Sequence, residues 1–300
     1  MPSSSINKLN TTMTITAELV NNLRNKTGAG IMDCKKALVE TGGDIEKAIE
    51  LLRKKGIASA SKKAGRETKE GAVAFSVRDN KGVLIELNCE TDFVARNENF
   101  QKVLNQLLDY AFELNVFDKE TLLNSTSGGK KISDYVLEQS AVLGENLTFR
   151  RVVAIESKNN LFSYIHNAYS NNSGKIAVLV ELTSNASKDK LEDLGRKVAM
   201  HIAAMKPLVL NSADMSSEVL QKEKEIFTEQ AKASGKPEAV IEKMAEGRLR
   251  KFLEEVVLNE QVSIFDGKTK IKDFVANVAK DLGVDVKISA YKKFELGEIV

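Results

Sequence analysis

The chain has 300 residues, of which 42% are hydrophobic and 29% are charged. These fractions are typical of a globular protein that buries a real core, and the length favours about two domains, or one domain with appendages. The 44 basic and 42 acidic residues nearly balance. The composition therefore excludes binding to nucleic acid or membranes through a strong overall positive charge.

The first residues and the cysteines indicate the cellular compartment in which we expect the protein. Residues 1–12 are rich in Ser and Asn and lack both the apolar centre of a secretory signal and the arginines of a transit peptide. We expect them to be a disordered extension outside the fold. No apolar run is long enough to cross a bilayer. Cys34 and Cys89 lie far apart without metal-ligand spacing, which favours free thiols in a reducing cytosol.

Residues 13–56 are predicted to form a compact three-helix docking domain. Thr16 is a candidate N-cap for the first helix, the second begins near Asp33, and Asp44 can cap the third. A unit this small buries little surface, which suits a docking module. Ile31 and Met32 follow a Gly-rich turn and form either an exposed apolar contact or part of the core.

Residues 57–71 contain few large apolar side chains and are predicted to be a flexible linker. The most basic stretch of the chain runs into this segment and contains Lys54, Lys55, Lys62, Lys63, Arg66 and Lys69. These charges either stay solvated or bind RNA. No aromatic residues lie between them to stack on bases, which favours the solvated alternative.

Residues 72–156 are predicted to form a first core subdomain. An alternating strand turns at residues 79–82 into a second strand, and a long amphipathic helix follows from Phe100. Asn97 is a candidate N-cap for that helix. The strand-to-helix corner carries an acid beside a large aromatic, Asp92 and Phe93. Either the pair inserts into another molecule, or Phe93 caps the local core and Asp92 serves the helix start.

Residues 157–300 repeat the pattern as a second core subdomain. Residues 180–183 match residues 85–88 in position, which indicates an internal duplication of an antiparallel sheet covered by a helix, an α+β fold. The second corner lacks the acid–aromatic pair. An antiparallel helical hairpin is inserted at about residues 212–258, and its narrow apolar stripes suit a partner-facing arm or a homodimer contact. A last helix and a closing strand are expected over residues 271–282 and 284–294.

The motifs of common enzyme classes are absent from the sequence. Neither histidine has a Cys or carboxylate partner at metal-ligand spacing, and no nucleophile elbow, metalloprotease or dinucleotide motif occurs. We assign His201, in the middle of a helix, to packing. His166 is predicted at a loop tip, where it is the better candidate for a contact. The chain is interpreted as a binding protein without a cofactor.

Two long motifs, residues 23–38 (LRNKTGAGIMDCKKAL) and 88–97 (NCETDFVARN), resemble the bacterial-type translation elongation factor Ts family. Residues 144–146, 201–207 and 235–237 support the resemblance, which runs in order from about Thr14 to the end. It implies a ubiquitin-associated-like N-terminal domain, a duplicated α+β core and an inserted helical hairpin. The implied activity is guanine-nucleotide exchange on elongation factor Tu in the cytosol, with no covalent chemistry, no direct nucleic-acid contact and no membrane contact.

The resemblance also implies which residues touch the partner. The corner Thr91, Asp92, Phe93 and Val94 would intrude near the magnesium site of the partner's nucleotide. Further implied contacts, beside Ile31 and Met32, are Lys35, Leu143, Gly144, His166, Ile264 and Phe265. Of these, Leu143, Ile264 and Phe265 match the family in residue type rather than identity.

Two further expectations concern the end of the chain and other functions. Some members of the family carry a C-terminal helix beyond the closing strand, and contacts made by such a helix are expected to be missing in a chain that stops at Val300. The alternative functions are an RNA- or ribosome-associated adaptor that uses the basic stretch and a purely structural dimer formed by the hairpin. Adaptor binding would depend steeply on salt.

Overall fold

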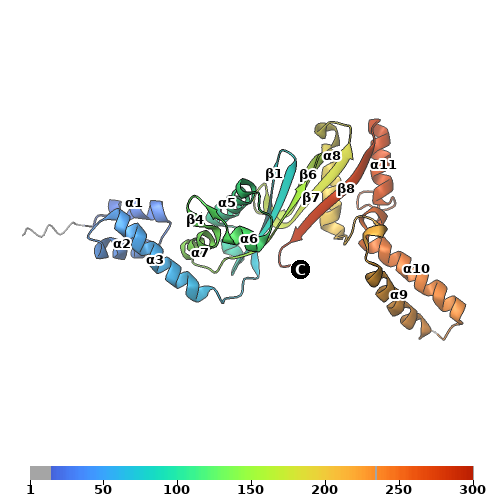
Figure 1. The fold of residues 1–300 in the computed structure, drawn as a ribbon, viewed down its shortest axis with the longest axis horizontal. Coiled ribbons are helices and arrows are strands. Elements are labelled where there is room, and N and C mark those ends of the chain that lie inside the picture. The colour runs from blue at the N-terminus through green and yellow to red at the C-terminus, as the bar shows by residue number, and fades with distance from the viewer. Residues whose placement is uncertain (1–14, 234, 300) are drawn as a thin grey trace, which may run out of the picture.

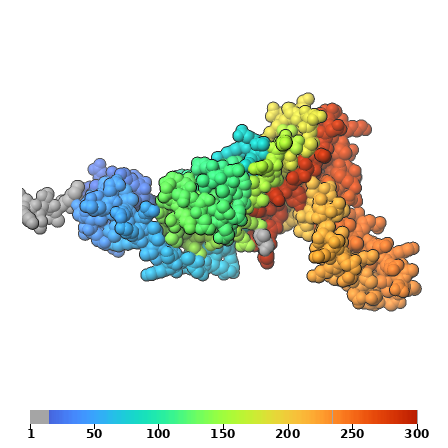
Figure 2. All heavy atoms as spheres, viewed as in Figure 1, coloured from blue at the N-terminus to red at the C-terminus, as the bar shows by residue number. Residues whose placement is uncertain are grey.

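The computed structural model describes residues 15–233 and 235–299, so the extension predicted over residues 1–12 lies outside the described part of the chain. The molecule is elongated, with three N-terminal helices at one end and a pair of long helices at the other (Figure 1). Figure 2 shows the same two ends projecting from a thicker middle. In that middle, helices pack against an antiparallel sheet, which confirms the α+β class.

The N-terminal unit consists of α1 (Ala17–Thr27), α2 (Ile31–Glu40) and α3 (Ile45–Lys63). The predicted caps are confirmed, since the side chains of Thr16 and Asp44 each accept a backbone N–H of the following helix. The second helix begins at Ile31 rather than near Asp33, because Gly30 in extended conformation serves as its N-cap. The unit has its own small core, formed by Val20, Leu23, Cys34, Ala37, Leu38 and Ala48.

The third helix is longer than predicted and lies against α7 (Ile132–Leu143) of the core. Gly56 of α3 lies so close to α7 that a Cβ there would come within 2.9 Å of the Cβ of Ala141. At the end of α3, the Lys63 ammonium donates to the Gly144 carbonyl over 2.6 Å. The N-terminal unit is therefore docked on the core through α3.

This docking corrects the prediction of a flexible linker over residues 57–71. Residues 57–63 continue α3, and the amide of Asn146 donates to the carbonyls of Ala64 and Arg66. Residues 70 and 71 already belong to the first strand. The linker prediction was wrong because it rested on the scarcity of large apolar side chains, whereas Ala and Lys are strong helix formers and α7 supplies the packing partner.

One sheet runs through both predicted subdomains. Its strands are β1 (Glu70–Arg78), β2 (Lys81–Cys89), β5 (Thr148–Glu156), β6 (Asn160–Ala168), β7 (Ser173–Ser184) and β8 (Val286–Glu295). The order is β5-β2-β1-β7-β6, with β8 also paired to β7, and every pairing is antiparallel. The two halves meet where β1 pairs with the start of β7. A separate two-stranded ladder joins β3 (Thr126–Ser127) and β4 (Lys130–Lys131).

The two halves share a pattern of pairing. β2 lies between β1 and β5, and β7 pairs with β6 on one side and β8 on the other. The register shifts between Glu86 and Leu87 in one half and between Glu181 and Leu182 in the other. These irregularities fall at the positions that the sequence aligns, and bulges are specific local features of a fold.

Helices cover the sheet in both halves. α5 (Glu98–Leu114) packs on the first half and α8 (Lys188–Met205) on the second, each through a continuous apolar face. Shorter helices complete the core, namely α4 (Asp92–Ala95), α6 (Lys119–Asn124) and α11 (Ile271–Leu282). Together they bury two large clusters, one for each half.

The hairpin lies between α8 and α11 in sequence. It consists of α9 (Ser217–Lys232) and α10 (Glu238–Val256), flanked by the short 3-10 helices η1 (Ser212–Asp214) and η2 (Leu258–Glu260). Phe227 and Phe252 make an edge contact between the two helices, with ring centroids 6.4 Å apart. The pair projects from the body of the molecule (Figure 1).

A buried carboxylate ties the last strand to the first half. The Glu86 side chain is fully buried and accepts from the Arg151 guanidinium over 2.6 Å and from the Gly297 N–H over 2.9 Å. The same guanidinium donates to the Glu295 carbonyl and lies over the ring of Phe294, 4.1 Å from its centroid. The end of β8 is thereby fixed against strands that lie far earlier in the sequence.

We predict that Arg151→Met lowers the free energy of unfolding by about 3 kcal/mol or more, because it leaves the Glu86 carboxylate buried without its main partner. Denaturation in urea measures the change. Asp193→Asn is the control, since its pair with Lys197 is exposed on α8 and its loss costs about 0.5 kcal/mol at most. Equal effects of the two variants would contradict the anchoring role of Glu86.

Candidate partner interface

The corner after β2 is built as a single helical turn between a strand and a long helix. β2 ends at Cys89, α4 follows with Thr91 as its N-cap, and α5 begins after Asn97. The Asn97 side chain accepts the Asn99 N–H over 2.8 Å, which confirms the predicted cap of the long helix. The caps therefore fix where α4 and α5 begin, and the short turn between β2 and α5 has little conformational freedom.

Phe93 points away from the protein and is 83% exposed. The alternative that it caps the local core is therefore wrong. Its neighbour Val94 packs partly on the core, and Ala95 is fully buried, so the turn is anchored on the side opposite the ring. Asp92 lies in the first turn of α4, where a negative charge is favourable, and pairs loosely with Arg96 at 3.9 Å.

The C-terminal side of the corner is held by residues of both halves. Gln101 donates from its side-chain nitrogen to the Ala95 carbonyl over 2.7 Å, and its oxygen accepts from the Ser173 hydroxyl. The guanidinium of Arg96 lies over the Tyr169 ring, 4.6 Å from its centroid. Tyr169 belongs to the connection between β6 and β7 and Ser173 is the first residue of β7, so the second half of the sheet supports the corner of the first.

The thiol of Cys89 stays protonated below the corner. Burial, together with the nearby Glu145 charge, raises the pKa of Cys89 to about 12. The neutral thiol donates to the Thr91 carbonyl over 3.1 Å. Because only the thiolate is an effective nucleophile, Cys89 serves the shape of the corner rather than a reaction.

The candidate contacts on the N-terminal unit lie on the surface. Ile31 is 49% exposed and Met32 is 62% exposed, so the alternative that both belong to the core is wrong. Lys35 is exposed on the same helix, α2. Val39 extends this apolar surface and was missed by sequence reasoning, because a single Val at helical spacing does not show whether its face is buried.

Leu143 and Gly144 stand at the end of α7. Leu143 packs partly on the core, while Gly144 is exposed and has a φ of 79°, the left-handed conformation that ends many helices. The chain then turns so that the next residue, Glu145, reaches the corner. The structure thus brings Leu143 and Gly144 close to residues 91–94.

His166 is exposed but does not lie at a loop tip as predicted. It belongs to β6, where it pairs with Ile176 of β7, and its Nδ1 is 3.2 Å from the Tyr164 hydroxyl. The prediction was wrong because the ladder with β7 continues past His166 to Ala168. The His166 side chain still faces solvent, as a contact residue requires.

Ile264 and Phe265 follow the hairpin and are 43% and 38% exposed. Phe265 stacks on Phe274 of α11, with ring centroids 5.8 Å apart. Beneath them His201 is fully buried, as its assignment to packing requires. The Ile264 N–H donates to Nδ1 of His201 over 3.4 Å, and Nε2 lies 3.0 Å from the side-chain oxygen of Gln261.

The candidate contacts do not form one compact site. The corner and the end of α7 lie together, whereas α2 lies near one end of the molecule and residues 264–265 follow the hairpin near the other (Figure 1). A partner that touched all of them would extend along much of the molecule. Large extended contacts are typical of protein–protein recognition rather than of a small-molecule cleft.

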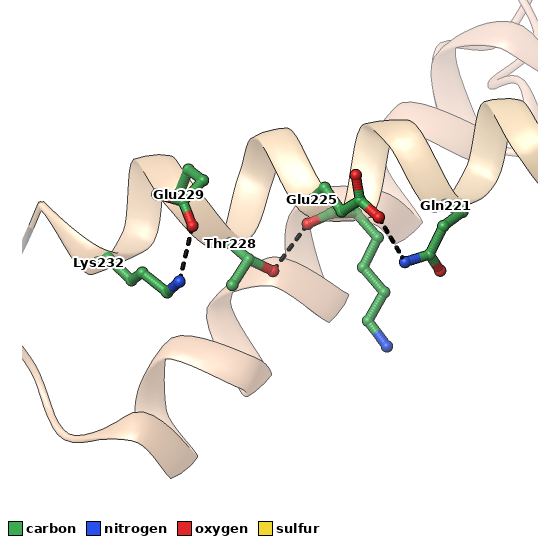
Figure 3. A pocket seen from close by; sticks show the side chains of 6 residues that line it. Gln221, Glu225, Thr228, Glu229 and Lys232 are labelled. Atoms are coloured by element: carbon green, nitrogen blue, oxygen red, sulfur yellow. Dashed lines mark hydrogen bonds and ion pairs between the residues drawn. The ribbon is translucent and has the colours of Figure 1, made fainter.

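Metal-binding clusters and membrane-spanning helices are absent from the part of the chain that the structure describes. Residues 15–233 and 235–299 contain no group of three or more His, Cys, Asp or Glu that could hold a metal ion. The same residues contain no helix long and apolar enough to span a membrane. Figure 3 shows a shallow hollow on α9, where neighbouring polar side chains bond to one another: Gln221 to Glu225, and Lys232 to Glu229.

The basic stretch is largely engaged within the protein. Four of its basic side chains pair with carboxylates. Lys54 pairs with Glu50, and Lys55 pairs with Glu40. Arg66 pairs with Glu90, and Lys69 pairs with Glu67. Lys63 is bonded to the Gly144 carbonyl. Charges that are already paired attract phosphate groups less strongly, which weakens the RNA-binding alternative.

Comparisons with known proteins point to one family. Residues 90–298 match the family model described as "Elongation factor TS". The chain is 47% identical over 287 residues to an elongation factor Ts of Paramagnetospirillum magneticum, with 95% of this chain and 92% of that protein covered. Elongation factor Ts of Rickettsia felis is 46% identical with coverages of 95% and 92%, and that of Orientia tsutsugamushi is 47% identical with 95% and 93%.

The buried His201 gives a pH prediction. Burial lowers its pKa below the usual 6.5, so the unfolded chain takes up a proton near pH 6.5 that the folded chain does not. The folded state should therefore lose stability as the pH falls below 6.5 toward the folded pKa, by at most about 1.4 kcal/mol per pH unit. Urea denaturation at pH 7.5 and 5.5 measures the loss.

Two variants provide the controls for this prediction. His201→Asn should be less stable at both pH values but should lose this pH dependence. His166→Gln should keep the pH dependence, since it leaves the buried His201 in place. If the pH dependence of stability were lost in His166→Gln and kept in His201→Asn, the assignment of this dependence to His201 would be wrong.

Proposed function

The chain belongs to the elongation factor Ts family, and on that premise we propose that it is a guanine-nucleotide exchange factor for elongation factor Tu. In this function it binds the GDP-bound partner during the elongation cycle and promotes release of the nucleotide. The observation that carries the proposal is Phe93, a large apolar side chain that stands 83% exposed on a turn held from several sides. The proposed place of action is the cytosol.

In the proposed mechanism the corner enters the partner beside its magnesium and phosphate site. Phe93 inserts between packed elements of the partner and keeps them apart, while Asp92 brings a negative charge near the metal that the phosphates hold. The magnesium ion and the nucleotide then lose contacts that depend on the closed arrangement. No covalent bond forms or breaks, so this function requires no general acid, base or nucleophile.

The other candidate contacts would position the corner on the partner. We assign this role to Ile31, Met32 and Lys35 on the N-terminal unit, to Leu143 and Gly144 beside the corner, and to His166, Ile264 and Phe265 on the second half. Because α3 is docked on α7, the N-terminal unit would act as a rigid extension of the interface. A rigid contact costs less conformational entropy on binding than one that swings on a flexible linker.

The test is the release of a fluorescent GDP analogue from elongation factor Tu, with and without this protein. We expect substoichiometric amounts to accelerate the release strongly. Chelation of magnesium by EDTA is the control that the partner is active and can release its nucleotide. If the folded protein left the rate unchanged while EDTA raised it, the exchange function would be wrong.

Phe93→Ala tests the role of the ring. We expect the maximal rate of GDP release to fall by about tenfold or more, because the variant keeps the outer contacts but loses the side chain that enters the partner. The concentration of the chain that gives half the maximal rate should change little. Phe93→Leu is the matched control and should retain much of the rate, since it keeps a large apolar side chain. A Phe93→Ala variant that kept the full maximal rate of GDP release would contradict the insertion mechanism.

A further inference from the structure

We propose that Glu145 is a positioning residue that fixes the corner in the conformation that presents Phe93. The inference rests on the proposed function and adds a residue to it. Glu145 follows Gly144 at the end of α7, and the segment that carries it reaches the corner from a separate part of the chain. It acts through Thr91 rather than on the partner itself.

The contacts of Glu145 converge on the start of α4. One carboxylate oxygen, Oε2, accepts the backbone N–H groups of Glu90 and Thr91 over 3.0 and 2.9 Å. The other, Oε1, accepts the Thr91 hydroxyl over 2.5 Å. Three donors of two consecutive residues are thus held by one side chain that lies 55 and 54 positions away in sequence.

The chemistry of the site calls for a carboxylate. A carboxylate offers two acceptor oxygens and no proton, so it can receive all three donors at once. Hydrogen bonds to an ionised acceptor are also shorter and stronger than those between neutral groups. A glutamine could still accept the two N–H groups through its oxygen, but it would turn an NH₂ group toward the Thr91 hydroxyl.

The orientation of Thr91 passes on to Phe93. Because the Thr91 hydroxyl donates its proton to Glu145, its oxygen is aimed to accept the Val94 N–H, 3.4 Å away, as the N-cap of α4. The turn capped in this way contains Phe93. Without Glu145 the hydroxyl can rotate, and the two N–H groups lose their protein acceptor.

A second hydrogen bond joins the same two segments, residues 90–91 and residues 145–146, with donor and acceptor exchanged. The Asn146 N–H donates to the Glu90 side chain over 2.7 Å, so residues 90–91 and 145–146 bind each other reciprocally. The Asn146 side chain in turn donates to the carbonyls of Ala64 and Arg66 after α3. The contact between these two segments therefore also fixes the position of the corner relative to the docked N-terminal unit.

Glu145→Ala is the principal test, with release of the fluorescent GDP analogue from elongation factor Tu as the readout. We expect the maximal release rate to fall by about tenfold, with little change in the concentration that gives half of it. Glu145→Gln should recover part of the rate. Glu120→Ala is the control, because Glu120 is exposed on α6 and pairs with its neighbour Lys119 rather than with α3 or the corner.

A double-mutant cycle separates positioning from a general loss of stability. If Glu145 acts only through Phe93, then Glu145→Ala should cause no further loss of rate in a Phe93→Ala background. Losses that multiply in the double variant would overturn the proposal. So would a Glu145→Ala variant with the full rate. If Glu145→Ala folds poorly, Thr91→Val removes the linking hydroxyl alone and should give the same dependence on Phe93.

Amide hydrogen exchange on the free protein tests the positioning without any partner. Glu145→Ala should speed exchange at the N–H groups of Glu90, Thr91 and Val94, and the control Glu120→Ala should not. Unchanged protection at these three positions would overturn the positioning role. Faster exchange combined with a wild-type protein that fails to release GDP would support the positioning role and overturn only the proposed exchange function.

Discussion

The proposed function depends on keeping a large apolar side chain in water without letting the backbone beneath it relax. Burying a phenylalanine side chain is worth about 1.5–3 kcal/mol, so a flexible corner would fold Phe93 back onto the protein. The corner resists this because contacts reach it from several directions. Glu145 holds its start, Gln101 holds the end of the turn, and Tyr169 packs against Arg96. The ring stays exposed because the turn is rigid.

Comparing the two halves of the sheet distinguishes the residues that support the fold from those that serve the proposed function. Glu86 and Glu181 occupy matching positions beside matching irregularities, and both are buried and hydrogen-bonded. The corners that follow differ, since residues 183–187 contain no aromatic side chain. The second half instead contributes support: Tyr169 and Ser173 contact the first corner or its helix, and Gly297, just after β8, donates its N–H to Glu86.

Local pattern was enough to predict the six strands of the large sheet, apart from the end of β6, together with the long helix and the caps at Asp44 and Asn97, because these depend on near neighbours in sequence. It could not decide whether Phe93 is exposed, since an isolated aromatic fits either a core or a surface. It also missed the continuation of α3, which depends on contact with α7. The contact of Glu145 with Thr91 joins distant parts of the chain, and no local pattern indicates it.

The most direct test of the account is the coupling between the chain and GDP on elongation factor Tu. Calorimetry would measure the affinity of the chain for the nucleotide-free and the GDP-bound partner. Exchange by linkage requires the chain to bind the GDP-bound form more weakly, by the same factor by which it weakens GDP. We predict that this difference nearly vanishes in Phe93→Ala. A variant that kept the full difference would contradict the central claim that Phe93 carries the coupling.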